Sequence, residues 1–291
     1  MKSTANHYAH GALAAEQLVK SWGLALPIDP FAIAAEFKIT VAAKPASHPG
    51  VSGMLVRVGN EFAIAYATHI DNEPFQRFSV AHELGHYFLP GHPEAVFDAR
   101  GIHESRAQFT SKDRYEMEAD GFAAGLLMPR HLFFPALERA GQGLAAVESL
   151  ADLCKTSLHA TAIRLAQCTR DPAAIVVSSG SRIDHCFMSE VLKAVNGIDW
   201  LHKREAVPRS TPTFTFNQDA ENVRRATRIE DTSNLQDWFG GRRRIAIDED
   251  VIGLGTYGKT LTVLYNINMP EPEEEEDEAA LVESWTPRFR R

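Results

Sequence analysis

The chain has 291 residues, of which 38 are acidic and 30 are basic, so its formal net charge is −8. Residues 271–278 carry seven of the acids and no base, and the nearly balanced remainder argues against a uniformly basic nucleic-acid binder. No apolar run approaches the roughly 20 residues of a membrane helix, and residues 1–10 lack the apolar stretch of a secretory signal. These features, with three cysteines that show no CxxC spacing, predict a cytoplasmic protein with reduced thiols and no membrane contact.

The predicted elements begin with two helices within residues 11–37, where apolar residues recur at helical spacing. Residues 51–58 and 61–68 are strand-like, and Gly59-Asn60 between them tolerates positive φ, which predicts a hairpin. Such a hairpin offers an edge strand that could pair with an extended peptide. A helix follows from about Phe75 to Leu89.

The second half of the chain is less regular. Residues 92–111 are polar and unpatterned, which predicts a surface loop, and a second strong helix runs from about Arg114 to Leu127. Residues 141–168 predict two short helices, and residues 172–270 mix strand runs with loops. The acidic residues 271–291 cannot bury enough apolar surface to fold, so we expect a disordered tail there.

The chemistry is indicated by an H-E-x-x-H pattern, His82-Glu-Leu-Gly-His86, inside the first strong helix. Residues four apart lie on the same face of a helix, so both imidazoles can bind one Zn²⁺ ion. Glu83 stands beside the pair and is the predicted general base, which takes a proton from water and passes it to the leaving amine.

A catalytic zinc site needs a third protein ligand. His92 has the metzincin spacing, but Leu89 replaces the glycine that this signature requires. The alternative is a glutamate on the second helix, as in gluzincins, and both Glu116 and Glu118 qualify by residue type. Glu118 shares a face with Gly121, which would let two helices approach closely, yet helical geometry alone does not decide between the two glutamates.

Over residues 50–135 the sequence resembles the ImmA/IrrE family of zinc metallopeptidases, which pairs HELGH with a helix of the form E-x-E-A-x-x-F-A-x-x-L-L-M-P. The second pattern is similar to residues 116–129 of this chain. The resemblance implies that Glu118, the glutamate directly before alanine, is the third ligand. Asp120 stands where the family commonly has asparagine, which could alter the groups behind the metal ligands. The resemblance also implies an intracellular endopeptidase that cleaves a helix-turn-helix repressor, in stress responses or on mobile elements.

Three other features invite a different interpretation. Residues 253–260 match G-x-x-x-x-G-K-T, but a strand-like run follows where a phosphate loop needs a helix, so we predict a turn between two strands. Residues 148–168 resemble a helix-turn-helix, with Ser157 as the N-cap of the second helix. That helix offers few base-reading side chains, so a packing role is favoured and DNA contact stays open. Basic residues cluster at 203–204, 224–228 and 242–244. They are expected either to be solvated surface residues or to form a surface against which the acidic tail folds back.

Together these patterns predict an α+β fold with a gluzincin-like zinc metallopeptidase domain. The predicted division has four parts: a peptidase domain (1–135), a helix-turn-helix-like helical module (136–170), a mixed α/β and regulatory C-terminal domain (171–270), and the acidic tail (271–291). The first rival hypothesis is a non-catalytic regulator that binds DNA or a repressor on a peptidase-like fold. The second is a zinc hydrolase that acts on a non-peptide substrate. An intact Glu83 argues against the first, because a site used only for binding has no need of a base.

Overall fold

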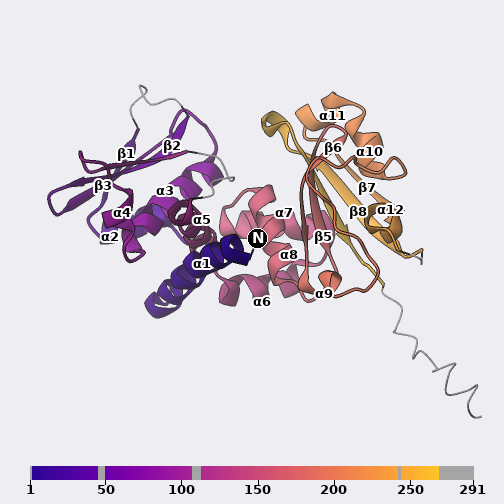
Figure 1. Ribbon diagram of the computed structural model, residues 1–291, viewed down its shortest axis with the longest axis horizontal. Coiled ribbons are helices and arrows are strands. Elements are labelled where there is room, and N and C mark those ends of the chain that lie inside the picture. The colour runs from indigo at the N-terminus through magenta and orange to yellow at the C-terminus, as the bar shows by residue number, and fades with distance from the viewer. Residues whose placement is uncertain (1, 45–49, 107–112, 242–243, 269–291) are drawn as a thin grey trace, which may run out of the picture.

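The computed structural model describes four stretches of the chain, residues 2–44, 50–106, 113–241 and 244–268 (Figure 1). The acidic tail 271–291 and two members of the third basic cluster, Arg242 and Arg243, lie outside the described residues, so the expectations for them stay predictions. Within the described part the chain is a mixture of helices and sheets, which confirms the α+β class. No helix in this part is long and apolar enough to cross a membrane.

The first sheet is built from four strands in the order β1-β3-β2-β4. Antiparallel β2 and β3 place Val58 opposite Glu61, which confirms the hairpin across Gly59-Asn60. Residues 92–111 were predicted as a loop, and that is wrong, because they contain a short helix and the edge strand β4, which pairs with β2. The strands are β1 (Thr40–Ala43), β2 (Val51–Val58), β3 (Glu61–Tyr66) and β4 (Ile102–Arg106).

Five helices accompany this sheet. The helix α3 packs on β2 and β3 and also against α5, and α1 lies along α5. The helix predicted from about Arg114 to Leu127 matches α5 in both bounds. The first of the two helices predicted within residues 11–37 corresponds to α1, which begins earlier than predicted. The helices are α1 (Lys2–Trp22), α2 (Pro30–Glu36), α3 (Glu73–Phe88), α4 (His92–Val96) and α5 (Arg114–Leu127).

Three further helices connect the two sheets: α6 (Arg130–Ala140), α7 (Gly143–Cys154) and α8 (Leu158–Cys168). The hydroxyl of Ser157 accepts a hydrogen bond from the amide of Ala160, as expected for the N-cap of α8. The helix pair α7 and α8 packs on strands of the second sheet, so its visible role is structural. The predicted boundary at residue 135 falls inside α6, and the division into domains stays a prediction.

The second sheet has five antiparallel strands in the order β6-β5-β9-β8-β7. Figure 1 shows the two sheets on opposite sides of α6, α7 and α8. The main buried core runs from the first sheet through these helices to one face of the second sheet, and a smaller core covers the other face. The elements are β5 (Ala174–Ser179), β6 (Arg182–Met188), α9 (Glu190–Lys193), α10 (Pro212–Asn217), α11 (Ala220–Arg224), β7 (Arg228–Asn234), α12 (Leu235–Phe239), β8 (Ala246–Gly253) and β9 (Thr260–Tyr265).

The glycine-rich segment at 253–260 joins β8 to β9 through a single 3₁₀ turn at Gly255–Tyr257. A strand follows the turn, so no helix N-terminus is present to bind phosphate. The Lys259 ammonium is paired with the Asp184 carboxylate rather than directed into the turn. The structure therefore confirms the prediction of a turn between two strands.

The contact between α1 and α5 is closer than side chains would permit. A Cβ on Gly11 would lie 1.8 Å from the Glu118 carbonyl oxygen, and a Cβ on Gly121 would lie 2.0 Å from the Tyr8 carbonyl oxygen. Gly125 meets the backbone of α1 in the same way, with 2.5 Å to the Ala12 carbonyl oxygen. These three glycines let the two helix backbones touch, and nothing larger fits between them.

We expect Gly121→Ala to lower the melting temperature, because the added methyl group forces α1 away from α5 and uncovers apolar surface. The overpacking penalty of about 1–3 kcal/mol exceeds the gain of about 1 kcal/mol in helix propensity. Thermal unfolding checks this, with Leu13→Ala on the exposed side of α1 as the control. Equal melting temperatures for wild type and Gly121→Ala would contradict the close contact.

The Asp184–Lys259 pair predicts a pH-dependent contribution to stability. Burial alone would raise the pKa of Asp184, but hydrogen bonds from Lys259 and Ser179 outweigh it and lower the pKa below 3.8. A carboxyl whose pKa is lowered by folding stabilises the folded state above its unfolded pKa, and this contribution is lost as the pH falls through the folded pKa.

Asp184→Asn should therefore lower the free energy of unfolding by about 1 kcal/mol at pH 7 and by much less below about pH 3. Denaturant unfolding at several pH values measures the difference. Glu190→Gln is the control, because its partner Lys193 lies on the surface and Glu190 is 83% exposed. A deficit in Asp184→Asn that is independent of pH would contradict the ion pair.

Candidate metal centre

The helix α3 brings two histidines to one buried face. It starts at a clear signal, because the side chain of Asn72 accepts a hydrogen bond from the amide of Phe75. His82 and His86 lie one turn apart on this helix, and His86 is 0% exposed. All residues of α3 from Ser79 to His86 are buried, so the side of the helix that carries the histidines lies inside the protein.

The helix α5 crosses α3 at this point. It starts at Asp113, whose carboxylate accepts a hydrogen bond from the amide of Tyr115. Gly85 permits the crossing, because a Cβ there would already lie 3.1 Å from both the Cα of Ala119 and the Cβ of Phe122. Acidic side chains in the first turns of α5 therefore reach the histidines of α3.

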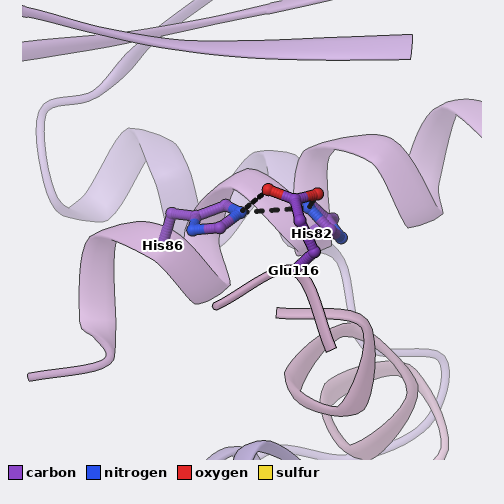
Figure 2. A group of neighbouring side chains, drawn as sticks. All are labelled: His82, His86 and Glu116. Carbon is purple, nitrogen blue, oxygen red and sulfur yellow. Dashed lines mark hydrogen bonds and ion pairs between the residues drawn. The ribbon is translucent and has the colours of Figure 1, made fainter. Parts of the chain in front are cut away.

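Figure 2 shows His82, His86 and Glu116 directed at one another. The two Nε2 atoms are 3.1 Å apart, and each lies 3.4 Å from a different carboxylate oxygen of Glu116. One donor atom from each residue falls within 4.8 Å of the others, and among the described residues this is the group that could hold a metal ion. Two imidazole nitrogens and one carboxylate, with room for water, form the donor set of a catalytic zinc site.

The protonation of the three groups agrees with this interpretation. Burial lowers the pKa of His86 to about 3, so its ring is neutral and can act as a ligand. Burial would also lower the pKa of His82, but contacts with Asp120 and Glu116 outweigh it and raise the pKa. Burial would raise the pKa of Glu116, but its contacts with His103, His82 and His86 lower it instead. The site therefore holds an ionised carboxylate beside one neutral imidazole and one imidazole that binds a proton readily, and a cation could take the place of that proton.

Glu83 lies next to this group with an unusual environment. It is 0% exposed, and neither of its carboxylate oxygens has a hydrogen-bond partner among the described residues. The strand β2 leaves room for it at Gly53, where a Cβ would stand 2.4 Å from Oε1 of Glu83. Burial raises the pKa of this carboxyl, opposed by the charges of His82 and His103 and by the nearby hydroxyl of Ser105. A buried, unpartnered carboxylate beside a metal site is suited to accept a proton.

The site opens into a cavity of about 600 Å³ that lies between the two sheets. One wall carries His82, Glu83 and Glu116, and the facing wall comes from the β8–β9 turn, including Tyr257. The turn between α7 and α8 forms a third side. Other lining residues are mostly apolar, among them Phe75, Phe78, Leu127, Met128, Leu158, Ile252 and Leu254.

Residues 34–166 match the family model described as the IrrE N-terminal-like domain, a peptidase family. This part of the chain is an IrrE-like domain. A comparison with curated proteins finds no match. Among solved structures, a Mycobacterium tuberculosis transcriptional regulator is similar, with a TM-score of 0.54 and 15% sequence identity over 88% of this chain and 76% of the other. At that identity the likeness concerns the fold.

Within the IrrE-like domain the structure places Glu118 differently from the expectation that it is the third metal ligand. Its Oε1 lies 3.0 Å from Nδ1 of His7 on α1, and its Oε2 lies 3.0 Å from Nε2 of His92. Glu116 and Glu118 are about 200° apart around α5. The glycines that share the face of Glu118 admit α1, not α3, so Glu116 is the glutamate that meets His82 and His86.

His92, the other candidate, lies behind His86 rather than beside the metal position. Its Nδ1 is 3.1 Å from Nδ1 of His86, on the side of the ring away from the converging Nε2 atoms. Tyr115 contacts the ring of His92 edge-on and lies behind the site as well. His103 is closer, with Nε2 3.0 Å from Oε1 of Glu116.

Two further residues belong to the IrrE-like site, and the sequence interpretation named a contact for neither of them. Asp120 lies 2.9 Å from Nδ1 of His82, which orients the ring so that Nε2 faces the metal position. The spacing of four residues from Glu116 puts Asp120 on the same helix face, and that signal was available in the sequence. His103 reaches the site only because β4 pairs with β2, and its polar strand gave no periodic signal.

We expect Glu116→Ala to lose bound metal and Glu118→Ala to keep one ion per chain when zinc is in excess. Only Glu116 lies with the two histidines, so only its removal takes away a ligand. Metal content after dialysis against a defined zinc concentration measures this, and a folded far-UV spectrum shows that each variant is intact. Full occupancy in Glu116→Ala together with loss in Glu118→Ala would restore the original ligand assignment.

Proposed function

We propose that the protein is a zinc-dependent endopeptidase. The observation that supports this most is the convergence of His82, His86 and Glu116, with the buried and unpartnered carboxylate of Glu83 at its side. A binding-only site would gain nothing from such a carboxylate, because an unsatisfied buried charge costs several kcal/mol. Membership of a peptidase family supports the same reaction class.

The residues of this chain divide the reaction between them. His82, His86 and Glu116 would hold the ion, which when bound supplies Lewis acidity to the peptide carbonyl and to water. Glu83 takes a proton from the attacking water and delivers it to the nitrogen of the leaving amine, so that the amide bond breaks without releasing an amide anion. The raised pKa of Glu83 makes it a stronger base than an exposed glutamate.

The strand β4 supports an extended peptide as the substrate. It is the edge of the first sheet, since among the described strands it pairs only with β2. Ser105 and Arg106 at its end line the cavity beside Glu83. A peptide that adds to this edge by main-chain hydrogen bonds would place a carbonyl at the metal position. The edge that adjoins the site is therefore β4, rather than the β2–β3 hairpin to which this role was first given.

We further propose that the substrate is a helix-turn-helix repressor and that cleavage relieves repression in the cytoplasm. The family resemblance supports this substrate class, and a similar solved structure is described as a transcriptional regulator. The cysteines among the described residues are unpaired, which fits a reducing compartment.

The test is incubation of the purified protein and Zn²⁺ with a repressor encoded beside it. Wild type should cleave the repressor, and Glu83→Gln should be slower by about 100-fold or more, because the base is lost while shape is kept. Product is followed by mass spectrometry. Glu94→Gln on the exposed surface of α4 is the matched control and should cleave normally.

Each other outcome has a definite meaning. Equal cleavage by wild type and Glu83→Gln would refute the mechanism. Binding without cleavage by both proteins would favour the non-catalytic regulator. Cleavage of a generic unfolded peptide with no cleavage of the repressor would keep the endopeptidase and reject the repressor as its substrate.

A further inference from the structure

We propose that His92 and Glu118 act as a positioning pair that holds His86 with a bare Nε2 directed at the metal. This inference rests on the proposed metal site and adds two residues to it. Neither residue touches the position where the three ligands converge. Their role would be to fix the proton on the far nitrogen of His86 and to keep its ring in one orientation.

A continuous line of hydrogen bonds carries the proposal. Nδ1 of His86 lies 3.1 Å from Nδ1 of His92, and Nε2 of His92 lies 3.0 Å from Oε2 of Glu118. Both imidazoles are 0% exposed and Glu118 is 4% exposed, so water does not compete for these bonds. The line starts at α3, passes through α4 and ends on α5.

The carboxylate at the end of the line sets the direction of every bond. An ionised Glu118 only accepts hydrogen bonds, so Nε2 of His92 must carry a proton and donate it. In a neutral ring Nδ1 of His92 is then an acceptor, and Nδ1 of His86 must be the donor. The remaining nitrogen of His86, Nε2, is left with a lone pair, which is the form that binds a metal ion.

A hydrogen bond donated in the reverse direction, from His92 to His86, is incompatible with metal binding by His86. If His92 donated through Nδ1, His86 would accept there, and its own proton would stand on Nε2 in the metal position. A neutral His92 in that state would also point a bare Nε2 at the Glu118 oxygen, placing two acceptors 3.0 Å apart in a buried place. Glu118 therefore favours the arrangement in which His86 donates to His92 and His92 donates to Glu118.

Glu118 is itself held firmly. Nδ1 of His7 contacts its second oxygen at 3.0 Å, and Nε of Arg114 lies 3.5 Å from the same oxygen. The close contact between α1 and α5, where Gly11 meets the Glu118 carbonyl, fixes the helix turn that carries it.

The experiment compares zinc affinity by competition with a fluorescent chelator. His92→Phe keeps the ring volume and removes the acceptor, and we expect a dissociation constant raised about 10- to 100-fold. His92→Asn keeps an acceptor oxygen where Nδ1 stood and should recover much of the lost affinity. His131→Phe makes the same exchange on the exposed surface of α6 and should bind zinc as wild type does.

A pair that acts as a unit should also be non-additive. Glu118→Leu removes the final acceptor, and we expect it to weaken zinc binding in the same direction as His92→Phe. The double variant should be no worse than His92→Phe alone. Independent, additive losses in the double variant would overturn the proposal, as would zinc binding by His92→Phe at wild-type affinity.

Two further measurements separate this idea from its alternatives. Long-range ¹H–¹⁵N spectra of the metal-free protein should show His86 as the Nδ1–H form, and an Nε2–H form would overturn the inference. A merely structural role would lower the melting temperature of the metal-free variants and leave their zinc affinity unchanged. If His86→Ala binds zinc as tightly as wild type, the proposed metal site itself fails, and the two failures are thereby distinguished.

Discussion

The close packing of α5 between α1 and α3 is the constraint on which the candidate site depends. Gly85 lets α3 approach one face of α5, while Gly11 and Gly121 let α1 approach another. Because α5 is packed this closely on two sides, its rotational orientation about its own axis is fixed. That rotation directs Glu116 to the histidines of α3 and Glu118 to the groups behind them. The candidate metal ligands and the residues behind them are therefore positioned together by backbone contact.

The electrostatics of the site follow from the same geometry. Most of its carboxylates are matched with a nitrogen: Glu116 with three histidines, Asp120 with His82, and Glu118 with His92 and His7. Glu83 is the exception, and it is also the most deeply buried of the four. The chain outside residues 271–278 is therefore nearly neutral overall, although this site brings many charged groups close together. Net charge gave no indication of it, because histidines count as neutral in that sum and the acids of the site are offset by lysines and arginines elsewhere in the chain.

Much of the fold of residues 50–127 could be predicted from the sequence, because the signals for its turns and helix starts are local. The hairpin at Gly59-Asn60 and the helices that start at Asn72 and Asp113 depend on turn and cap chemistry within a few residues. The strand β4 could not be predicted this way, since its partner β2 is about 50 residues earlier and its side chains do not alternate.

The sequence interpretation chose Glu118, whereas the structure brings Glu116 to His82 and His86, and the reason for this difference is related. The small-residue face of α5 correctly indicated a close helix neighbour, but the sequence did not say which helix it would be. The family resemblance then favoured the glutamate whose face belongs to α1. Helix periodicity supplies relative angles around one axis, whereas the identity of the neighbour is a property of the whole fold.

The cavity beside the site joins parts of the chain that are far apart in sequence, since Glu83 and Tyr257 line the same space. The candidate metal ligands and Glu83 line one wall, and a short turn between two strands lines the facing wall. Substitutions in that turn can change which side chains fit without moving a ligand or the base. If the proposed reaction takes place here, the groups that perform it and the groups that select its substrate lie on separate segments of the chain.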